Sequence, residues 1–146
     1  MSVYIQRETR VCEALAEAFA RLMPQLSPRL GAPAPEVLER IVFSPCSALF
    51  TARIGERIAG VLTLVWYDAP SGRKAWIEDV AVDAALRGRG AGEALVRAAL
   101  GHAVQIGAER VMLTSSPRRE AARALYRKVG FKEAETSVFV CKTDKE

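Results

Sequence analysis

The N-terminal part of the chain alternates between an extended and a helical pattern of apolar residues. Val3 to Gln6 has the pattern of a short strand, and from Val11 to Leu22 apolar side chains recur at helical spacing. Four of the seven prolines follow closely, which predicts a loop over residues 23–36 because proline interrupts a helix. Pro35 suits the first turn of a second helix, and an apolar stripe follows it.

The middle of the chain changes to the pattern of strands. Residues 48–53 and 57–67 predict two strands joined by a tight hairpin at Ile54-Gly55-Glu56. The second run, IAGVLTLVWY, is apolar at nearly every position, so we expect both of its faces to be covered. A turn over residues 68–74, which contains Pro, Ser and Gly, leads into a third strand at Ala75–Val82.

The C-terminal part alternates between helices and strands. The pattern predicts helices at Ala91–Ile106 and Arg118–Val129, and strands at Arg110–Thr114 and Val138–Cys141. Together with the earlier elements, this order indicates an α+β fold, a mixed sheet with helices covering its faces. Because no repeat or linker interrupts the pattern, we expect a single domain over residues 1–146.

Composition narrows the classes of partner. The chain has 146 residues, half of them apolar, which suits one domain with a substantial core. Its formal net charge is +4, and such an excess attracts polyanions. Because the chain has no long lysine or arginine tract, we expect a small polyanion such as a nucleotide cofactor, and not nucleic acid, as the partner.

The cysteines and the apolar segments indicate the compartment. Cys12, Cys46 and Cys141 lie far apart without a CxxC pair, which argues against a disulfide framework and against a metal site. The opening residues MSVYIQRETR lack the pattern of a signal peptide. No segment approaches the roughly 20 apolar residues that cross a bilayer. We therefore expect a cytoplasmic protein that does not bind membranes.

The most informative segment is the glycine-rich loop between the third strand and the helix that follows it. A glycine backbone can pass close to a bulky anion, and the first turn of a helix offers free N–H groups and a positive dipole end. Two arginines add positive charge there. We therefore predict a diphosphate site at Arg87, Gly88, Arg89, Gly90, Ala91 and Gly92.

Two other phosphate-binding loops do not fit this segment. A P-loop requires Gly-Lys-Ser/Thr, which is absent, and a dinucleotide fingerprint requires a third glycine where the chain has Glu93. The simpler alternative is a glycine-rich turn between strand and helix with solvated arginines. Three glycines alternating with other residues directly before a helix favour the anion site over that turn.

The chain resembles the GNAT superfamily of acetyltransferases. The family's acetyl-CoA signature is Gln/Arg-x-x-Gly-x-Gly/Ala, and residues 87–92 satisfy it at every fixed position. A second hallmark follows late in the chain, in Ala122, Leu125, Tyr126, Gly130 and Phe131. The resemblance implies a mixed, mostly antiparallel central sheet of about six to seven strands, flanked by about four helices, and acetyl-CoA as acetyl donor.

The resemblance also implies how the cofactor lies. Pantetheine would insert between two splayed strands alongside Val80, Ala81 and Val82, and amides from Arg89 to Gly92 would hold the pyrophosphate. Many members have asparagine seven residues before the tyrosine, where this chain has Arg119. An arginine at this position could still reach a phosphate.

Two carboxylates are the candidate bases. Amine acetylation requires a group that takes a proton from the ammonium ion, and Glu78 and Asp79 lie in the strand before the loop. Strand alternation predicts one face with Trp76, Glu78, Val80 and Val82, and the other with Ile77, Asp79 and Ala81. Glu78, acting through water, is the predicted base, and Asp79 replaces it if a bulge reverses the alternation. The alternative is that both carboxylates pair with surface arginines.

The resemblance assigns the remaining roles. Tyr126 would be the general acid that protonates the departing thiolate, and the Val80 amide would polarise the thioester carbonyl. The Ile-Glu-Asp pattern is similar to that of the glucosamine-phosphate type of the family, in which these acids face the acceptor. Asp79 is therefore predicted to contact the substrate. Trp76 is also predicted to contact it, as an aromatic residue that could line the acceptor cleft, and the alternative is that it packs in the core as aromatic residues of strands usually do. His102 lies on the apolar face of its helix and is predicted to be a packed residue.

The sequence thus predicts an acetyl-CoA-dependent N-acetyltransferase that acts by direct transfer to a primary amine, on a small molecule or a peptide. A catalytically silent acyl-CoA-binding regulatory module is the main alternative. A nucleic-acid-binding protein that uses the basic face of residues 118–128 is the third hypothesis, which the lack of aromatic residues in the glycine loop disfavours. Strand exchange at the C-terminal edge would give a homodimer, which the sequence leaves open.

Overall fold

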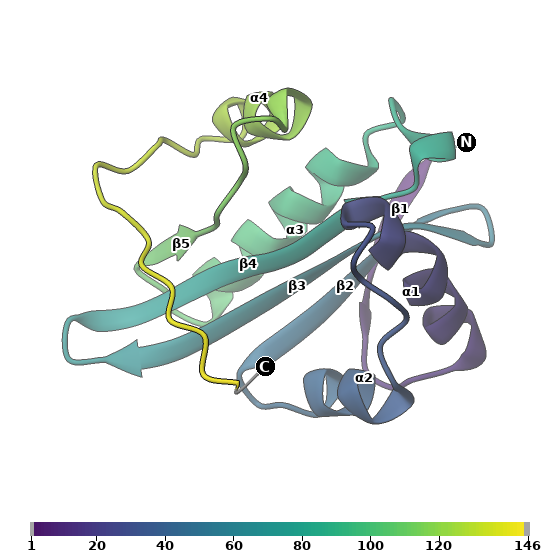
Figure 1. Cartoon of the computed structure of the whole chain (residues 1–146), viewed down its shortest axis with the longest axis horizontal. Coiled ribbons are helices and arrows are strands. Elements are labelled where there is room, and N and C mark those ends of the chain that lie inside the picture. The colour runs from purple at the N-terminus through teal and green to yellow at the C-terminus, as the bar shows by residue number, and fades with distance from the viewer. Residues whose placement is uncertain (1, 145–146) are drawn as a thin grey trace.

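The computed structural model describes residues 2–144, which form five strands and four helices around one sheet (Figure 1). The strands are β1 (Val3–Glu8), β2 (Ser47–Ile54), β3 (Arg57–Ala69), β4 (Gly72–Val82) and β5 (Arg110–Met112). The helices are α1 (Glu13–Leu26), α2 (Pro35–Val42), α3 (Ala91–Gln105) and α4 (Glu120–Lys128), with a short 3₁₀ turn, η1, at Ala84–Leu86. The sheet order is β1-β2-β3-β4-β5, and only the β4–β5 pair is parallel.

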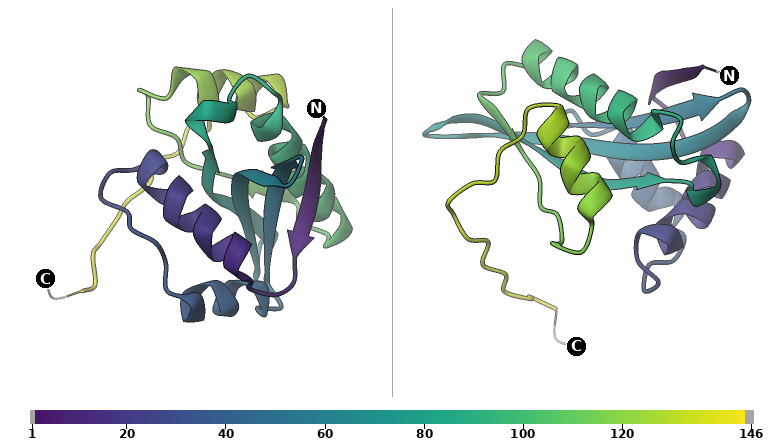
Figure 2. Two further views of the ribbon diagram at one scale, coloured as in Figure 1. Left: turned by 90° about the vertical axis from the view of Figure 1, so that its right-hand side faces the viewer. Right: turned by 90° about the horizontal axis from the view of Figure 1, so that it is seen from above.

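Helices cover both faces of this sheet (Figure 2). On one face, α3 buries a stripe that includes Leu95 and Val96 against Leu62 and Leu64 of β3. On the other, α1 and α2 form a second core with residues such as Val61. The expectation that both faces of β3 are covered is therefore confirmed. Burial of this apolar surface is the main stabilising contribution to the fold.

The sheet has fewer strands than the six to seven predicted. The segment predicted as a strand at Val138–Cys141 pairs with no strand among residues 2–144, and Val138, Phe139 and Val140 are exposed. β-branched and aromatic residues favour a strand, but a strand also needs a neighbouring backbone to pair with. The composition of this segment favours an extended backbone but cannot provide a strand for it to pair with.

The first helix extends further than the prolines predicted. α1 continues through Pro24 to Leu26, so the predicted loop over residues 23–36 begins later. Pro24 lies in the last turn and removes one helical hydrogen bond. The helix tolerates it because only two residues follow Pro24 before the helix ends. Within residues 2–144, no helix is long and apolar enough to cross a membrane.

A β-bulge in β4 changes which side chains share a face. Thr63 of β3 pairs with Glu78 and Val61 pairs with Ala81, so the one residue between them in β3 lies opposite two residues of β4, Asp79 and Val80. Asp79 occupies the bulge with a positive φ of 50°. Beyond the bulge, Val80 packs against the α3 core, and Ala81 belongs to the core under α1.

The predicted grouping of Glu78 with Val80 and Val82 on one face is therefore wrong. Ile77, which precedes the bulge, shares the α3 core with Val80 and Val82. Glu78 lies between Ile77 and the bulge, so the strand's alternation places it on the face opposite Ile77. Asp79 itself lies in the bulge that reverses the alternation.

Candidate active site

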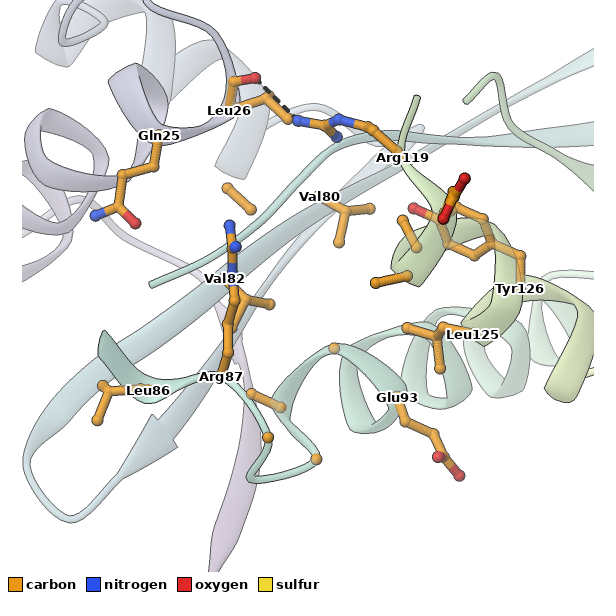
Figure 3. Close-up of a pocket in the computed structure, with 18 of the residues that line it drawn as sticks. Gln25, Leu26, Val80, Val82, Leu86, Arg87, Glu93, Arg119, Leu125 and Tyr126 are labelled. Carbon is orange, nitrogen blue, oxygen red and sulfur yellow. Dashed lines mark hydrogen bonds between the residues drawn. The ribbon is translucent and has the colours of Figure 1, made fainter. Parts of the chain in front are cut away.

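A cleft of about 610 Å³ opens between the end of β4, the loop before α3 and the first half of α4 (Figure 3). Its lining includes most residues predicted to hold the cofactor, namely Val80, Ala81, Val82, Arg87, Gly88, Gly90, Ala91 and Gly92. Arg89 was also predicted to bind the cofactor, but it is exposed and does not line this cleft. The fold thus gathers the strand and the glycine loop around one space.

The glycine loop has the backbone that an anion site requires. Gly88 and Gly90 have φ values of +80° and +86°, which residues with a side chain rarely adopt. Gly90 is the N-cap of α3, so the amides of the next three residues have no acceptor within the helix. These N–H groups and the positive end of the helix dipole can bind a phosphate.

Charges around the loop favour an anion in the cleft. The Arg87 side chain extends into the cleft in Figure 3, whereas Glu93 points away from it. The carboxylate of Glu93 accepts hydrogen bonds from Lys128 at 2.8 Å and from Arg97 at 2.9 Å, and these bonds lower the pKa of Glu93. Glu93 therefore has its negative charge compensated by two cations and does not repel a bound phosphate.

The strands beside the cleft separate. β4 pairs with β5 only between residues 74–76 and 110–112, so among residues 2–144 the second half of β4 has no strand partner on that side. Val80 and Val82 of this half line the first cleft. A chain such as pantetheine can bind to backbone groups that a missing strand leaves unpaired.

A second cleft of about 290 Å³ adjoins the first. It is lined by Ile77, Glu78 and Asp79 of β4, by residues 113–116 after β5, and by Leu26, Val80, Arg119 and Tyr126. The last four residues also line the first cleft. The two clefts therefore meet at residues that include Val80 and Tyr126, which is the arrangement that a transfer between two bound molecules requires.

Both candidate bases line the second cleft and not the first. Partial burial, together with the negative charge of Asp79, raises the pKa of Glu78 above the usual value. Among residues 2–144, neither Glu78 nor Asp79 forms an ion pair, so the alternative of pairing with surface arginines has no support. A carboxylate of raised pKa binds a proton more strongly than an ordinary one, which suits it to the role of base.

Tyr126 lies half-buried at the junction of the clefts, with its ring against Phe131 at a centroid distance of 5.9 Å. Burial raises the pKa of its phenol, and the charge of Arg119 partly opposes this shift. The phenol is therefore protonated at neutral pH and available as a donor. Figure 3 shows its hydroxyl end on the side of the cleft where Val80 lies.

Trp76 does not line either cleft. Its Nε1 donates a hydrogen bond of 3.4 Å to the hydroxyl of Tyr67 on the neighbouring strand. Trp76 precedes Glu78 by two residues, before the bulge, and so lies on the same face of β4. The structure thus places Trp76 beside the acidic cleft but not in its wall.

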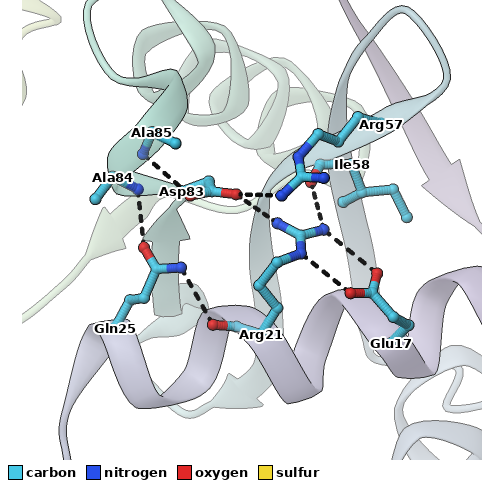
Figure 4. A network of polar contacts seen from close by, with 8 residues as sticks. All are labelled: Glu17, Arg21, Gln25, Arg57, Ile58, Asp83, Ala84 and Ala85. Carbon is cyan, nitrogen blue, oxygen red and sulfur yellow. Dashed lines mark hydrogen bonds and ion pairs between the residues drawn. The ribbon is translucent and has the colours of Figure 1, made fainter.

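The site also contains residues that the sequence did not single out. Gln25 and Leu26, at the end of α1, line the first cleft. Gln25 accepts a hydrogen bond of 2.8 Å from the Ala84 amide, and buried Asp83 binds the guanidinium of Arg21 (Figure 4). These contacts hold the turn that leads into the glycine loop against α1. The sequence offered one signal for this network, namely Asp83 directly before the turn, because an aspartate at such a position commonly caps the backbone.

His102 packs between aromatic side chains, as expected. Its ring lies 5.8 Å from that of Phe50 and 5.4 Å from that of Trp66, and burial lowers the pKa of the imidazole. In the described part of the chain, no group of three or more His, Cys, Asp or Glu side chains could hold a metal ion.

Comparison with known proteins identifies the family. The model of the Acetyltransferase (GNAT) family matches residues 12–131. Glucosamine 6-phosphate N-acetyltransferase 1 of Oryza sativa subsp. japonica is 34% identical over an alignment of 130 residues, which covers 82% of this chain and 76% of the rice protein.

Solved structures share the fold. A transcriptional regulator from Bacillus halodurans superposes with a TM-score of 0.81 at 25% identity, covering 96% of this chain and 99% of that one. AAC(6')-Iy, solved in complex with the bisubstrate analog CoA-S-monomethyl-acetylneamine, superposes with a TM-score of 0.79 at 22% identity, covering 99% and 100%.

The matched family model covers most of the chain, and the fold and the glycine loop agree with it. The protein belongs to the GNAT family of acetyltransferases, whose members use acetyl-CoA.

Proposed function

We propose that the protein is an N-acetyltransferase that transfers the acetyl group of acetyl-CoA directly to a primary amine. The observation that carries this proposal is the meeting of two clefts at Val80 and Tyr126, one beside the glycine loop and one beside two carboxylates. A donor and an acceptor bound in these clefts would have their reacting groups side by side, which removes much of the entropic barrier.

The first cleft would hold the cofactor, which supplies an activated acetyl thioester. The amides of Gly90 to Gly92 and the guanidinium of Arg87 would bind the diphosphate, and Arg89 would add positive charge from outside the wall. The backbone of Val80, Ala81 and Val82 would hold the pantetheine arm. The Val80 amide would donate to the thioester oxygen, where negative charge develops during transfer.

Two side chains would move the protons. Glu78, through a water molecule, would take a proton from the acceptor's ammonium group, so that the neutral amine can attack the carbonyl carbon. Tyr126 would give its phenolic proton to the sulfur as the carbon–sulfur bond breaks. The nitrogen loses two protons in all, one before the attack and one as the amide forms. One is released to solvent through Glu78 and its water, and the other balances the proton that Tyr126 gives to the sulfur. The bulge is the case in which the sequence predicted Asp79 as base, so Asp79 is the alternative; Glu78 remains the first candidate because it lines the same cleft and its pKa is raised.

The acceptor is a primary amine of a small molecule or a peptide. Glu78 and Asp79 give the second cleft a negative charge that favours a cationic group over an anionic one. Asp79 would contact the acceptor directly, and Trp76 would border the acceptor from the neighbouring part of the sheet. The name of the rice relative indicates an amino sugar phosphate as the acceptor of that protein.

A thiol-release assay tests the proposal. The wild-type protein would be mixed with acetyl-CoA and a panel of amino sugars, polyamines, amino acids and lysine peptides, and free CoA would be measured. Turnover with at least one amine, together with the acetylated product in the mass spectrum, is the expected result. Binding of acetyl-CoA by calorimetry without turnover on any amine would favour the catalytically silent module instead.

A homodimer formed by strand exchange is the assembly that we propose to test alongside activity. Val138, Phe139 and Val140 support it, because three consecutive apolar residues are exposed in the single chain. Light scattering coupled to size exclusion would show a mass of two chains, and a mass of one chain would remove this part of the proposal.

A further inference from the structure

Arg119 joins two elements that lie far apart in the sequence. Its Nη2 atom donates a hydrogen bond of 2.9 Å to the carbonyl oxygen of Leu26, 93 positions earlier. Figure 3 shows the arginine reaching from the start of α4 to the end of α1. The bond therefore spans the cofactor cleft from one wall to the other.

The bond completes the C-terminal end of α1. Leu26 is the last residue of this helix, so its carbonyl oxygen has no donor within the helix. The last turn of α1 has no basic residue to offset the negative end of the helix dipole. A guanidinium supplies both the missing donor and the missing charge, and charged donors make stronger hydrogen bonds than neutral ones.

The position of α4 depends on few contacts. No side chain of this helix is fully buried. Its links to α3 include Leu125, which packs close to Gly92, and an ion pair of 2.8 Å between Lys128 and Glu93 in which the lysine is largely exposed. Exposed ion pairs hold an element weakly. The Arg119 bond to Leu26 is therefore an important restraint on the first turn of α4.

The same bond crosses the place where the two clefts meet. Arg119 and Leu26 are two of the four residues that line both clefts, and the other two are Val80 and Tyr126. The restraint thus acts next to the atoms that would exchange the acetyl group. The charge of Arg119 also opposes the rise in the pKa of the Tyr126 phenol that burial causes.

We propose that Arg119 is a positioning residue, whose bond to Leu26 clasps α4 to α1 and thereby holds Tyr126 beside Val80 at the junction of the clefts. This inference rests on the proposed role of Tyr126 as general acid. Arg119 replaces the asparagine that many members of the family have at this position, so the clasp is a property of this chain.

Other charged groups also face Tyr126, and they must be controlled. Those that share a cleft wall with it are Glu78 and Asp79 of β4, Arg87 of the loop, Glu93 of α3, and Arg118 and Glu120 at the start of α4. Substitutions at Arg119 leave all of these in place. Loss of the Arg119 charge alone raises the pKa of the phenol, so a titration that also moves in Arg119→Lys, which keeps the charge, is the result that reports on the clasp.

The test compares Arg119→Met, Arg119→Lys and the control Arg127→Met, which removes an exposed arginine of the same helix that lines neither cleft. For Arg119→Met we expect kcat to fall about 10- to 100-fold, because small misplacements of a reacting group have costs of this size. The acetyl-CoA Kd, measured by calorimetry, should change little by comparison. Arg119→Lys should recover part of kcat, and Arg127→Met should match wild type.

A second measurement does not require turnover. In chains with Tyr4→Phe and Tyr67→Phe, ultraviolet titration reports Tyr126 alone, because these are the three tyrosines of the protein. Arg119→Met should move the phenol titration to higher pH. An unchanged titration together with an unchanged kcat would overturn the clasp. Should wild type fail to bind acetyl-CoA, the proposed function would fall, and the titration would still decide whether Arg119 acts on Tyr126.

Discussion

The carboxylate of Asp83 lies 2.6 Å from the guanidinium of Arg21, although the two residues are 62 positions apart in the chain. Asp83 also accepts hydrogen bonds from the guanidinium of Arg57 at 3.2 Å and from the amide of Ala85 at 3.1 Å. The side chain of Asp83 is only 5% exposed. This network fixes the turn between β4 and the glycine loop to α1, so it sets the shape of the cofactor cleft from outside it.

Asp83→Ala should therefore destabilise the protein. The substitution removes the buried partner of the Arg21 guanidinium and leaves only the exposed Glu17 and the Ile58 carbonyl, and breaking such a pair costs about 3 kcal/mol. Urea denaturation followed by circular dichroism would measure the change in the free energy of unfolding. Asp68→Ala is the matched control, because Asp68 pairs with Arg73 at the surface and should matter far less. Equal losses for the two variants would contradict a structural role for the Asp83 network.

The same carboxylate predicts a pH dependence of stability. Burial by itself raises the pKa of Asp83, but hydrogen bonds from the Ala85 amide and from Arg57 outweigh it and hold the pKa below the usual value. The group's contribution to stability is therefore complete above the unfolded-state pKa of about 3.9 and declines as the pH falls toward the lower folded-state pKa. Urea denaturation at a series of acidic pH values should show this decline in wild type and a smaller one in Asp83→Asn.

Gly90→Glu should abolish acetyl-CoA binding. The substitution places a carboxylate at the N-cap of α3, next to the amides that would bind the diphosphate, and it forces a side chain into a positive φ. We expect the affinity to fall at least about 100-fold, the size of effect that two close negative charges produce in a site of low dielectric. Calorimetry with acetyl-CoA measures it.

Gly101→Glu provides the control for this variant. Gly101 lies in the same helix, is exposed, and has open space around the position of an added Cβ atom. It adds the same charge to the protein without touching the loop. If Gly90→Glu bound acetyl-CoA as tightly as Gly101→Glu, the glycine loop would not be the diphosphate site.

Glu78→Gln should remove the acidic limb of the pH–rate profile. A general base acts only when deprotonated, so the wild-type rate rises with pH through the raised pKa of Glu78. The glutamine variant should lose about 10²- to 10⁴-fold in kcat, with no titration of this group left in the profile. Glu56→Gln, at an exposed hairpin turn, should behave like wild type. A full acidic limb in Glu78→Gln would transfer the role of base to Asp79.

Asp79→Asn should shift that limb without abolishing it. The negative charge of Asp79 raises the pKa of Glu78, so its removal should move the limb to lower pH. Asparagine tolerates the positive φ of the bulge, which keeps the backbone unchanged. A limb that moved to higher pH, or one that did not move, would show that the two carboxylates are not coupled as the structure indicates.

Tyr126→Phe should lower kcat more than it raises the KM for the amine. The phenol would give its proton only as the thiolate departs, so its loss should cost about 10²- to 10⁴-fold in turnover. The raised pKa of Tyr126 keeps the wild-type phenol protonated, so no alkaline limb should appear below about pH 10. Tyr4→Phe, at an exposed position of β1, is the control. Unchanged turnover in Tyr126→Phe would remove the general acid from the mechanism.

The sequence by itself determined which elements form and in what order. The hairpin at residues 54–57, the helix that begins at Ala91 and the short helix that carries Tyr126 all follow from local periodicity, glycine and proline. The glycine loop could be predicted as well, because a positive φ and free helical amides are local properties of Gly88 and Gly90.

Only the tertiary structure decided which of these groups meet. The bulge at Asp79 depends on how β3 pairs with β4, and it separates Glu78 from Val80. The segment at residues 138–141 has the composition of a strand but no neighbouring strand, and Arg119 meets Leu26 only because α1 and α4 face each other across the cleft. Local sequence specifies backbone preference, whereas register and contact between distant segments come from the packing of the whole chain.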